Sequence, residues 1–159
     1  MYELDKIDTT ILNILSLDAR TPFKDIAEIC KLSRAAVHQR VQRMIAKGVI
    51  IGSGYHVDLI KIGYRTYAYV GVKLERASYY KRVSEELVKI PEVIECNFTT
   101  GLHSLFIKLY ARDNNHLLDI LNGKIQQIDG VVSTETMITL ERIFHRPLLL
   151  PEDFEDEEE

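Results

Sequence analysis

The segment from Lys24 to Lys47 reads KDIAEICKLSRAAVHQRVQRMIAK and has the pattern of a helix, a tight turn and a longer helix. Ile26, Ala27 and Cys30 are spaced to share one face of the first helix. Ser33 follows the turn and is a favoured N-cap, because its hydroxyl can accept a hydrogen bond from a backbone N–H of the next helix. Apolar residues then recur at helical spacing at Val37, Val41, Met44 and Ile45. The segment therefore predicts a helix-turn-helix.

The opposite face of the second helix is polar, with small side chains at its start, amides in the middle and a guanidinium behind. The residues on this face are Ala35, Gln39, Gln42, Arg43 and Ala46. The N-terminal half of such a helix fits a DNA major groove, where Gln and Arg can read base edges. An ordinary amphipathic hairpin with a solvated polar face gives the same pattern, so both interpretations stay open on the pattern alone.

If the helix enters DNA, the residues at its front are expected at or near the groove. These are Ser33, Arg34, Ala35, Ala36, His38 and Gln39. Three further basic residues, Lys24, Arg40 and Arg43, are candidates either for phosphate contacts or for ion pairs that hold the helix in place.

The chain around this segment completes a DNA-binding unit in residues 1–57. Residues 5–17 have helical apolar spacing, and Thr21-Pro22 ends that helix because a proline disfavours helix at the preceding residue. Gly48 is placed to end the third helix. Two short apolar runs around Gly52-Ser53-Gly54, at residues 49–51 and 55–57, predict a strand, a turn and a second strand. Three helices followed by this wing predict a winged helix-turn-helix.

A second domain is predicted for residues 64–147, after a linker at residues 58–63. Strand patterns occupy residues 67–74, 93–100, 105–110 and 131–143, and helical patterns occupy residues 79–90 and 116–128. The order βαββαβ predicts a ferredoxin-like domain, so the fold class is α+β. Helices on one face of a sheet leave the other face to be covered, which predicts a homo-oligomer with sheets packed together. The aromatic residues that could serve such a face are Tyr67, Tyr69, Phe106 and Tyr110.

The composition of the 159 residues is that of an ordinary globular protein with a strongly acidic end. Seven of the last nine residues are carboxylates; without them, twenty Lys and Arg face seventeen Asp and Glu. We expect residues 148–159 to be a disordered acidic tail, more typical of a solubilising extension than of a DNA mimic. Neither a membrane-spanning run nor a signal peptide is evident, so we expect a cytoplasmic protein. Cys30 and Cys96 are expected to be reduced, buried thiols.

Four segments in order carry a resemblance to a known family. Residues 4–20 read LDKIDTTILNILSLDAR, residues 26–50 IAEICKLSRAAVHQRVQRMIAKGVI, residues 99–109 TTGLHSLFIKL and residues 125–141 IQQIDGVVSTETMITLE. Over residues 4–147 the chain resembles the leucine-responsive/asparagine-responsive (Lrp/AsnC) regulators and is closest to the asparagine-responsive branch. The resemblance implies a regulator that binds double-stranded DNA, forms dimers that assemble into octamers and binds no cofactor beyond an amino-acid effector.

The resemblance also implies where the effector binds, between dimers at one loop of the second domain. The implied loop residues are Thr99, Thr100, Gly101, Leu102, His103 and Ser104, and the implied neighbours are Gln127, Asp129, Thr134 and Thr136. Ser104 stands where the leucine-responsive branch usually carries an acidic residue, which favours asparagine as the effector. Without the resemblance the loop is a plain turn in which Gly101 supplies backbone freedom.

Other classes of function leave fewer signs in the sequence. The motifs GxSxG, P-loop, HExxH and CxxC are absent, and adjacent His103 and Ser104 point to opposite faces of a strand, so we expect no catalytic site and no metal site. Two alternatives remain: a regulator that acts independently of an effector, and an oligomeric small-molecule-binding module that does not bind DNA. The helix-turn-helix argues against the second.

Overall fold

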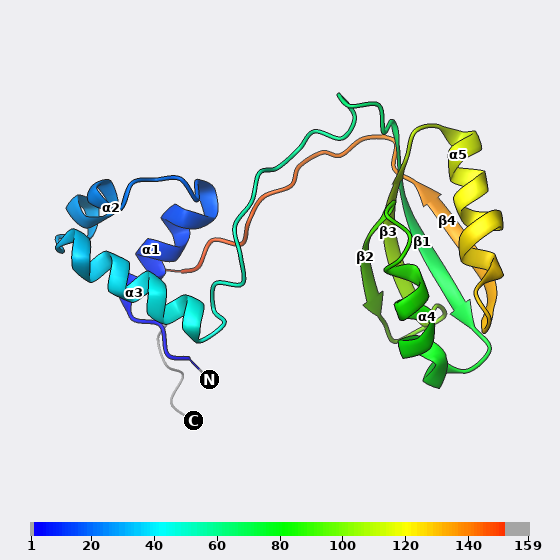
Figure 1. The fold of residues 1–159 in the computed structure, drawn as a ribbon, viewed down its shortest axis with the longest axis horizontal. Helices are drawn as coiled ribbons and strands as arrows, with labels where there is room; N and C mark the ends of the chain where they lie inside the picture. The colour runs from blue at the N-terminus through cyan, green and yellow to red at the C-terminus, as the bar shows by residue number, and fades with distance from the viewer. Residues whose placement is uncertain (1, 152–159) are drawn as a thin grey trace. The chain divides into compact units, whose positions relative to one another are not determined.

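The computed structural model describes residues 2–151 and divides into two compact units. Residues up to His56 belong to the first unit together with the C-terminal segment from Phe144, and Val57–Ile143 form the second unit (Figure 1). The C-terminal boundary differs from the expected one at residue 147, because the chain rejoins the first unit from Phe144 onward.

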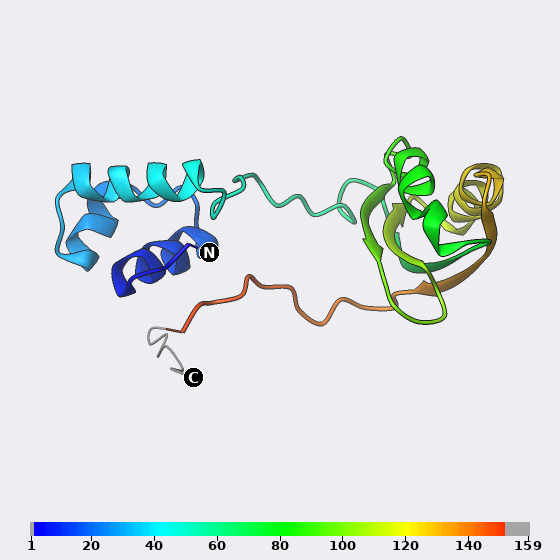
Figure 2. The same ribbon diagram turned by 90° about the horizontal axis from the view of Figure 1, so that it is seen from below.

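The first unit contains three helices, as predicted: α1 (Lys6–Leu17), α2 (Phe23–Cys30) and α3 (Arg34–Ala46) (Figure 2). Ser33 caps α3 by accepting a hydrogen bond from the Ala36 N–H at 3.1 Å, which confirms its predicted role. The core side chains with no exposed surface are Ile11, Ile26, Val37 and Met44. Ile45, predicted to belong to the apolar stripe of α3, is instead 45% exposed because it lies at the edge of that stripe.

The predicted wing is wrong for this structure, because residues 49–57 form no strand. Gly48 adopts a φ of 72° and ends α3 as predicted. The N–H groups of Val49 and Ile50 then donate to the carbonyl of Met44 at 2.9 and 3.3 Å, so both residues cap the helix instead of pairing as a strand. Ile51 and Tyr55 are 97% and 82% exposed, and a two-stranded hairpin without a packed face is marginally stable at best.

The second unit has the predicted βαββαβ order, with regular elements β1 (Thr66–Leu74), α4 (Tyr80–Leu87), β2 (Val93–Phe98), β3 (Leu105–Ala111), α5 (Asn114–Leu118) and β4 (Val131–Ile138). A 3₁₀ turn, Ala77–Tyr79 (η1), precedes α4, and α5 continues as a π-helical stretch, Asp119–Lys124 (η2), and a 3₁₀ turn, Ile125–Gln127 (η3). The sheet order is β2-β3-β1-β4 and all neighbours are antiparallel. The last strand is shorter than predicted, ending at Ile138 rather than residue 143.

The two faces of the sheet differ in cover. Both helices lie on one face (Figure 1), and alternate residues of β1 and β3 pack under them. The buried strand residues of this helix face include Val70, Val72, Leu105, Ile107 and Leu109. The intervening residues, Tyr67, Tyr69, Phe106, Lys108 and Tyr110, point to the other side because side chains alternate along a strand. We refer to this second side as the open face.

Two expectations for the remaining residues need correction. Cys96 is exposed and not buried, because it lies on β2, the edge strand of the sheet. Cys30, at the end of α2, is half-buried. Residues 148–151 were expected to be disordered, but Leu150 is held on α1. The Asn13 side chain donates to the Leu150 carbonyl at 2.9 Å and accepts from its N–H at 2.8 Å. Residues 152–159 of the predicted tail lie outside the described residues.

Candidate nucleic-acid interface and effector site

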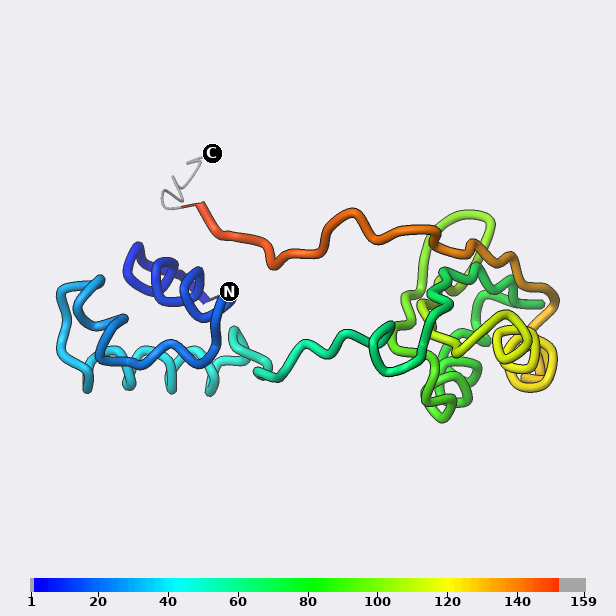
Figure 3. Tube along the Cα trace, turned by 90° about the horizontal axis from the view of Figure 1, so that it is seen from above, coloured from blue at the N-terminus to red at the C-terminus, as the bar shows by residue number. Residues whose placement is uncertain are grey.

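The front of α3 presents the side chains that the sequence predicted for a DNA groove. Arg34, Ala35, His38 and Gln39 are exposed, Ala36 is half-buried, and Ser33 is exposed while capping the helix. The trace of α2, the turn and α3 is continuous in Figure 3. The turn is tight because Lys31 takes the left-handed conformation with a φ of 54°. The Leu32 N–H then bonds the Ala27 carbonyl at 2.9 Å. Backbone contacts therefore fix the turn between α2 and α3, and the exposed side chains of α3 are not needed for it.

Arg40 and Arg43 form ion pairs with α1, which was one of the two roles left open for them. Arg40 Nη1 lies 2.8 Å from Asp8 Oδ1 and 2.6 Å from Asp5 Oδ2. Arg43 Nη2 lies 3.0 Å from Asp8 Oδ2, and Arg43 Nε donates to the hydroxyl of Tyr2 at 2.9 Å. Asp8 is only 1% exposed, so it depends on these guanidinium groups for compensation of its charge.

Asp5 serves both as the N-cap of α1 and as an ion-pair partner. Its carboxylate accepts the N–H of Asp8 at 2.7 Å. Partial burial opposes the shift, yet this hydrogen bond and the Arg40 guanidinium hold the pKa of Asp5 below its ordinary value. Lys24 has a weak partner in Glu28 at 3.9 Å, while Arg34 has no ion pair with any residue from 2 to 151. Arg34 is therefore the most available cation at the front of α3.

The loop from Thr99 to Ser104 joins β2 to β3 and is closed by two hydrogen bonds at its ends. The Thr99 N–H donates to the Ser104 carbonyl at 3.0 Å, and the Thr99 hydroxyl donates to the His103 carbonyl at 2.7 Å. Gly101 has a φ of 119°, which favours glycine at this turn. Thr100, Gly101 and Leu102 are exposed at its tip. A turn of this kind leaves hydroxyl and backbone groups near its tip for a small polar ligand.

His103 turns away from the loop tip and lies against β1 and β4. Its Nε2 is 2.6 Å from Glu135 Oε2 on β4, and its side chain is 20% exposed. A Cβ placed on Gly71 of β1 would lie 2.4 Å from the ring. His103 Nδ1 is buried and has no hydrogen-bond partner among residues 2–151. His103 is thus placed differently from the other loop residues that the resemblance groups with it.

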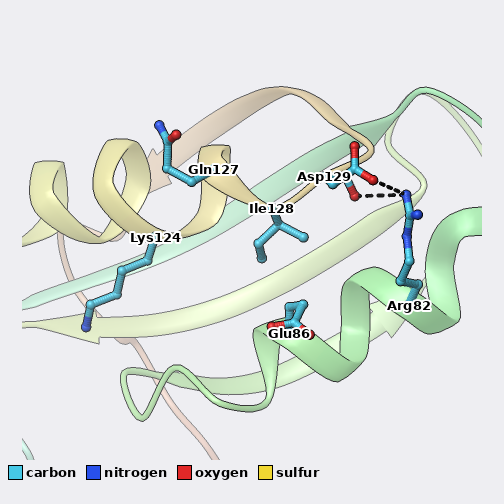
Figure 4. A pocket seen from close by; sticks show the side chains of 6 residues that line it. All are labelled: Arg82, Glu86, Lys124, Gln127, Ile128 and Asp129. Atoms are coloured by element: carbon cyan, nitrogen blue, oxygen red, sulfur yellow. Dashed lines mark hydrogen bonds and ion pairs between the residues drawn. The ribbon is translucent and has the colours of Figure 1, made fainter.

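The neighbours implied for the effector site are distributed over both helix and strand. Gln127 and Asp129 line a surface pocket of about 430 Å³ together with Arg82, Glu86 and Lys124 (Figure 4). Arg82 Nη2 pairs with Asp129 Oδ2 at 3.0 Å, whereas the Gln127 amide bonds the Asn122 carbonyl at 2.8 Å. In Figure 4 the side chains of Arg82 and Asp129 point toward each other.

The threonines of β4 belong to the helix face. Thr134 and Thr136 are the cross-strand partners of Val72 and Val70, which are core residues. The Thr134 hydroxyl accepts a hydrogen bond from the Gln126 amide at 2.7 Å. Glu135, between the threonines, therefore points to the open face. The ten predicted effector residues are consequently not one cluster: His103 lies toward the open face and Thr134 and Thr136 toward the helices.

Aromatic side chains cover the open face along β1 and β3, where the sequence placed them. Tyr67 stacks on Tyr110 with ring centroids 4.7 Å apart, and Tyr69 stacks on Phe106 at 5.9 Å. Burial and a hydrogen bond with Tyr69 raise the pKa of Tyr67. Arg142 lies over the Tyr67 ring at 5.0 Å and donates to the Tyr110 hydroxyl. Tyr69 and Phe106 remain half-buried, which leaves apolar surface on this face.

Comparison with known proteins identifies both units. An AsnC-type helix-turn-helix model matches residues 4–45, and the Lrp/AsnC ligand-binding domain model matches residues 67–149. The chain belongs to the Lrp/AsnC family of transcriptional regulators. A regulatory protein AsnC from Haemophilus influenzae is 36% identical over 141 residues, which is 89% of this chain and 94% of the relative.

Two solved structures of regulatory proteins share the fold described above. The structure of E. coli AsnC has a TM-score of 0.88 and 34% sequence identity, covering 94% of this chain and 100% of the other. A feast or famine regulatory protein from M. tuberculosis, complexed with L-methionine, has a TM-score of 0.87 and 26% identity over 93% of this chain and 100% of the other.

Three lining residues of the pocket were missed at the level of sequence. Arg82, Glu86 and Lys124 line it beside Gln127 and Asp129. Arg82 and Glu86 are four residues apart on α4, a spacing that places them on one helical face, but many solvated helices have the same pattern. Within residues 2–151, no helix is long and apolar enough to cross a membrane. In the same residues, no group of His, Cys, Asp and Glu side chains could hold a metal ion.

Proposed function

We propose that this Lrp/AsnC-family chain binds specific DNA sites through the front of α3. The single observation that carries the proposal is the exposure of Arg34, His38 and Gln39 on a helix whose ends and inner face are fixed by capping and core packing. Gln39 is the base reader in this proposal and Arg34 a backbone or base contact. Ala35 and Ala36 let the helix approach the groove closely.

The test uses a Gln39→Ala variant on two DNA duplexes, one taken from the region upstream of the chain's own gene and one with that sequence scrambled. We expect the variant to lose affinity for the upstream duplex and to keep its weak affinity for the scrambled duplex, because base contacts specify sequence whereas phosphate contacts do not. Equal losses on both duplexes would remove Gln39 from the base readers.

A homo-oligomer built on the open face is the second part of the proposal. Stacked Tyr69 and Phe106 leave apolar surface there, and a second copy can cover it with twofold symmetry. We propose dimers that assemble into octamers, as the family resemblance implies. Sedimentation of the full chain at micromolar concentration should show a dimer or a larger species, and Phe106→Glu should shift it to the monomer. A monomeric wild-type chain would contradict this part.

The effector is proposed to be a small amino acid held at the Thr99–Ser104 loop between dimers, with asparagine favoured. The loop tip is exposed, its ends are fixed by hydrogen bonds, and Ser104 offers a neutral hydroxyl for a neutral amide. The L-methionine complex of the M. tuberculosis relative supports an amino-acid ligand of some kind. An effector of this type acts only if it binds one assembly or orientation state more tightly than another.

Calorimetry with each of the twenty amino acids tests the effector. We expect asparagine to bind the wild type, and Ser104→Asp to weaken that binding because it places a carboxylate where a hydroxyl stood. Equal affinity for both proteins would remove Ser104 from the ligand contacts. Binding of methionine but not asparagine would change the ligand and keep the site, and binding of none of the twenty would overturn the proposal of an amino-acid effector.

A further inference from the structure

We infer that His103 is a positioning residue that fastens the Thr99–Ser104 loop to the open face of the sheet and does not touch the effector. The inference deepens the proposed function, because it rests on that loop as the effector site. The fastening itself is a property of the chain alone, so it can be measured without any effector.

The first observation is the close packing of the His103 ring against Gly71. A Cβ at Gly71 would lie 2.4 Å from Cδ2, 2.6 Å from Cγ and 2.9 Å from Nε2 of the imidazole, closer than real Cβ contacts. Gly71 sits in the middle of β1 and does not have a positive φ, so its backbone conformation does not require glycine. A glycine inside a strand weakens it and commonly marks the close approach of another group. The space that Gly71 leaves is occupied by His103.

The second observation is the reach of His103 across β1. Gly71 is paired with Phe106 of β3 on one side and with Glu135 of β4 on the other. His103 belongs to the loop that leads into β3, yet its Nε2 lies 2.6 Å from Glu135 Oε2. One side chain therefore connects the loop to a strand two positions away in the sheet. A hydrogen bond to a carboxylate is among the stronger ones in proteins.

The third observation is that the backbone of His103 is held as well as its ring. The Thr99 hydroxyl donates to the His103 carbonyl at 2.7 Å, which ties the start of the loop to its end. Movement of the loop tip is thereby transmitted through His103 to Gly71 and Glu135 on the open face. That face is the proposed contact with a second copy, so His103 gives a physical route between effector and assembly.

Hydrogen exchange on the full chain, read on peptides that cover residues 99–104, tests the fastening. His103→Ala should raise the exchange of the Thr99 amide, which donates to the Ser104 carbonyl, about tenfold, the fold-change expected from loss of one charge-assisted hydrogen bond. Gly71→Ala should do the same by displacing the ring, although it alters neither the loop nor Glu135. Gly123→Ala is the matched control, because Gly123 has no positive φ and a Cβ there meets nothing within 4 Å.

The double variant that combines His103→Ala with Gly71→Ala tests whether the two changes remove the same contact. Once His103 is alanine, the space over Gly71 is free, so Gly71→Ala should add no further exchange to His103→Ala. His103→Gln retains a donor that can reach Glu135 and should restore part of the protection. Unchanged loop exchange in both single variants, or additive effects in the double variant, would overturn the inference. If Gly71→Ala does not fold, His103→Ala and Glu135→Gln test the same contact from its other two partners, and each should raise the exchange of the loop.

Asparagine affinity on the same variants separates positioning from contact. A positioning role predicts that Gly71→Ala and His103→Ala weaken binding to the same extent, and that the double variant is no weaker than either. Loss in His103→Ala with full affinity in Gly71→Ala would show a direct contact and overturn the inference. If exchange responds as expected but no amino acid binds the wild type, the proposed effector fails while the fastening stands.

Discussion

Replacement of Arg40 by Gln distinguishes an ion pair that holds the DNA-binding unit together from a contact with DNA. Arg40 was a candidate for both roles, and its two short contacts to Asp5 and Asp8 favour the first. Its side chain is 24% exposed, and the Asp8 carboxylate it compensates is buried. Gln keeps part of the aliphatic stem but removes the charge, so the effect of the change is mainly electrostatic.

The expected cost follows from the burial of each partner. A hydrogen bond between charged groups contributes about 1.5–3 kcal/mol, and the pair with Asp8 is of this kind. The Asp5 side chain is 51% exposed, so its pair with Arg40 adds little. Asp8 also keeps Arg43 and the Tyr2 hydroxyl as partners. We therefore expect Arg40→Gln to lower the free energy of unfolding by about 2 kcal/mol.

Two measurements on Arg40→Gln separate a loss of stability from a loss of DNA contacts. Urea unfolding gives the stability, and the dependence of DNA affinity on salt gives the number of phosphate contacts, each of which contributes about 0.9 to the logarithmic slope. Arg40→Gln should lower the urea midpoint and leave the salt slope unchanged. Arg34→Gln is the matched control: Arg34 is exposed and has no ion pair within residues 2–151, so its loss should leave the midpoint unchanged and reduce the slope. A lower slope with an unchanged midpoint in Arg40→Gln would refute the reasoning.

Three further changes test other parts of the first unit. Because the pKa of Asp5 is lower in the folded state, its stabilisation is present above about pH 4 and is lost as the pH falls through the folded pKa; urea midpoints from pH 7 to 3 should fall less in Asp5→Asn than in the wild type. Met44→Ala should cost about 2–5 kcal/mol in the same assay, while Ile45→Ala, exposed on the same helix, should cost less than 1 kcal/mol or so; equal costs would contradict the assigned core. Asn13→Leu should increase hydrogen exchange at Leu150, and Asn13→Asp, which keeps the acceptor, should increase it less; an unchanged rate would show that Asn13 does not hold this segment.

The helix-turn-helix could be predicted because its determinants are local. The apolar spacing of Val37, Val41 and Met44, the cap at Ser33 and the terminating Gly48 lie within sixteen residues, and each is found where the sequence indicates. The prediction of a wing was wrong because a hairpin is stabilised by packing of one face against distant residues, which the local sequence does not specify. The apolar side chains of residues 49 and 50 were available to the helix core, and their N–H groups were available to the end of α3.

The second unit shows the same limit at the level of single side chains. Strand order and alternation predicted the aromatic open face, because periodicity alone places Tyr67 and Tyr69 together. The position of His103 depends on the register of β3, β1 and β4, which the local pattern of the loop does not contain. One signal was nevertheless present in the sequence: Gly71 interrupts a run of mostly β-branched and aromatic residues, and the close approach of another group is one common reason for a glycine in a strand.

The arrangement of β4 explains how one strand can serve two roles. Thr134 and Thr136 face the helices, and the Thr134 hydroxyl accepts a hydrogen bond from the Gln126 amide, whereas Glu135 between them faces the open face and contacts His103. In the proposed mechanism, a ligand that shifts the loop acts on β4 through Glu135, and a change at the helix turn acts on the same strand through Thr134. Because successive side chains of a strand point to opposite faces from one backbone, β4 connects the two faces directly. The proposed regulation by assembly requires such a coupling, and β4 is an element that could provide it because it carries contacts on both faces of the sheet.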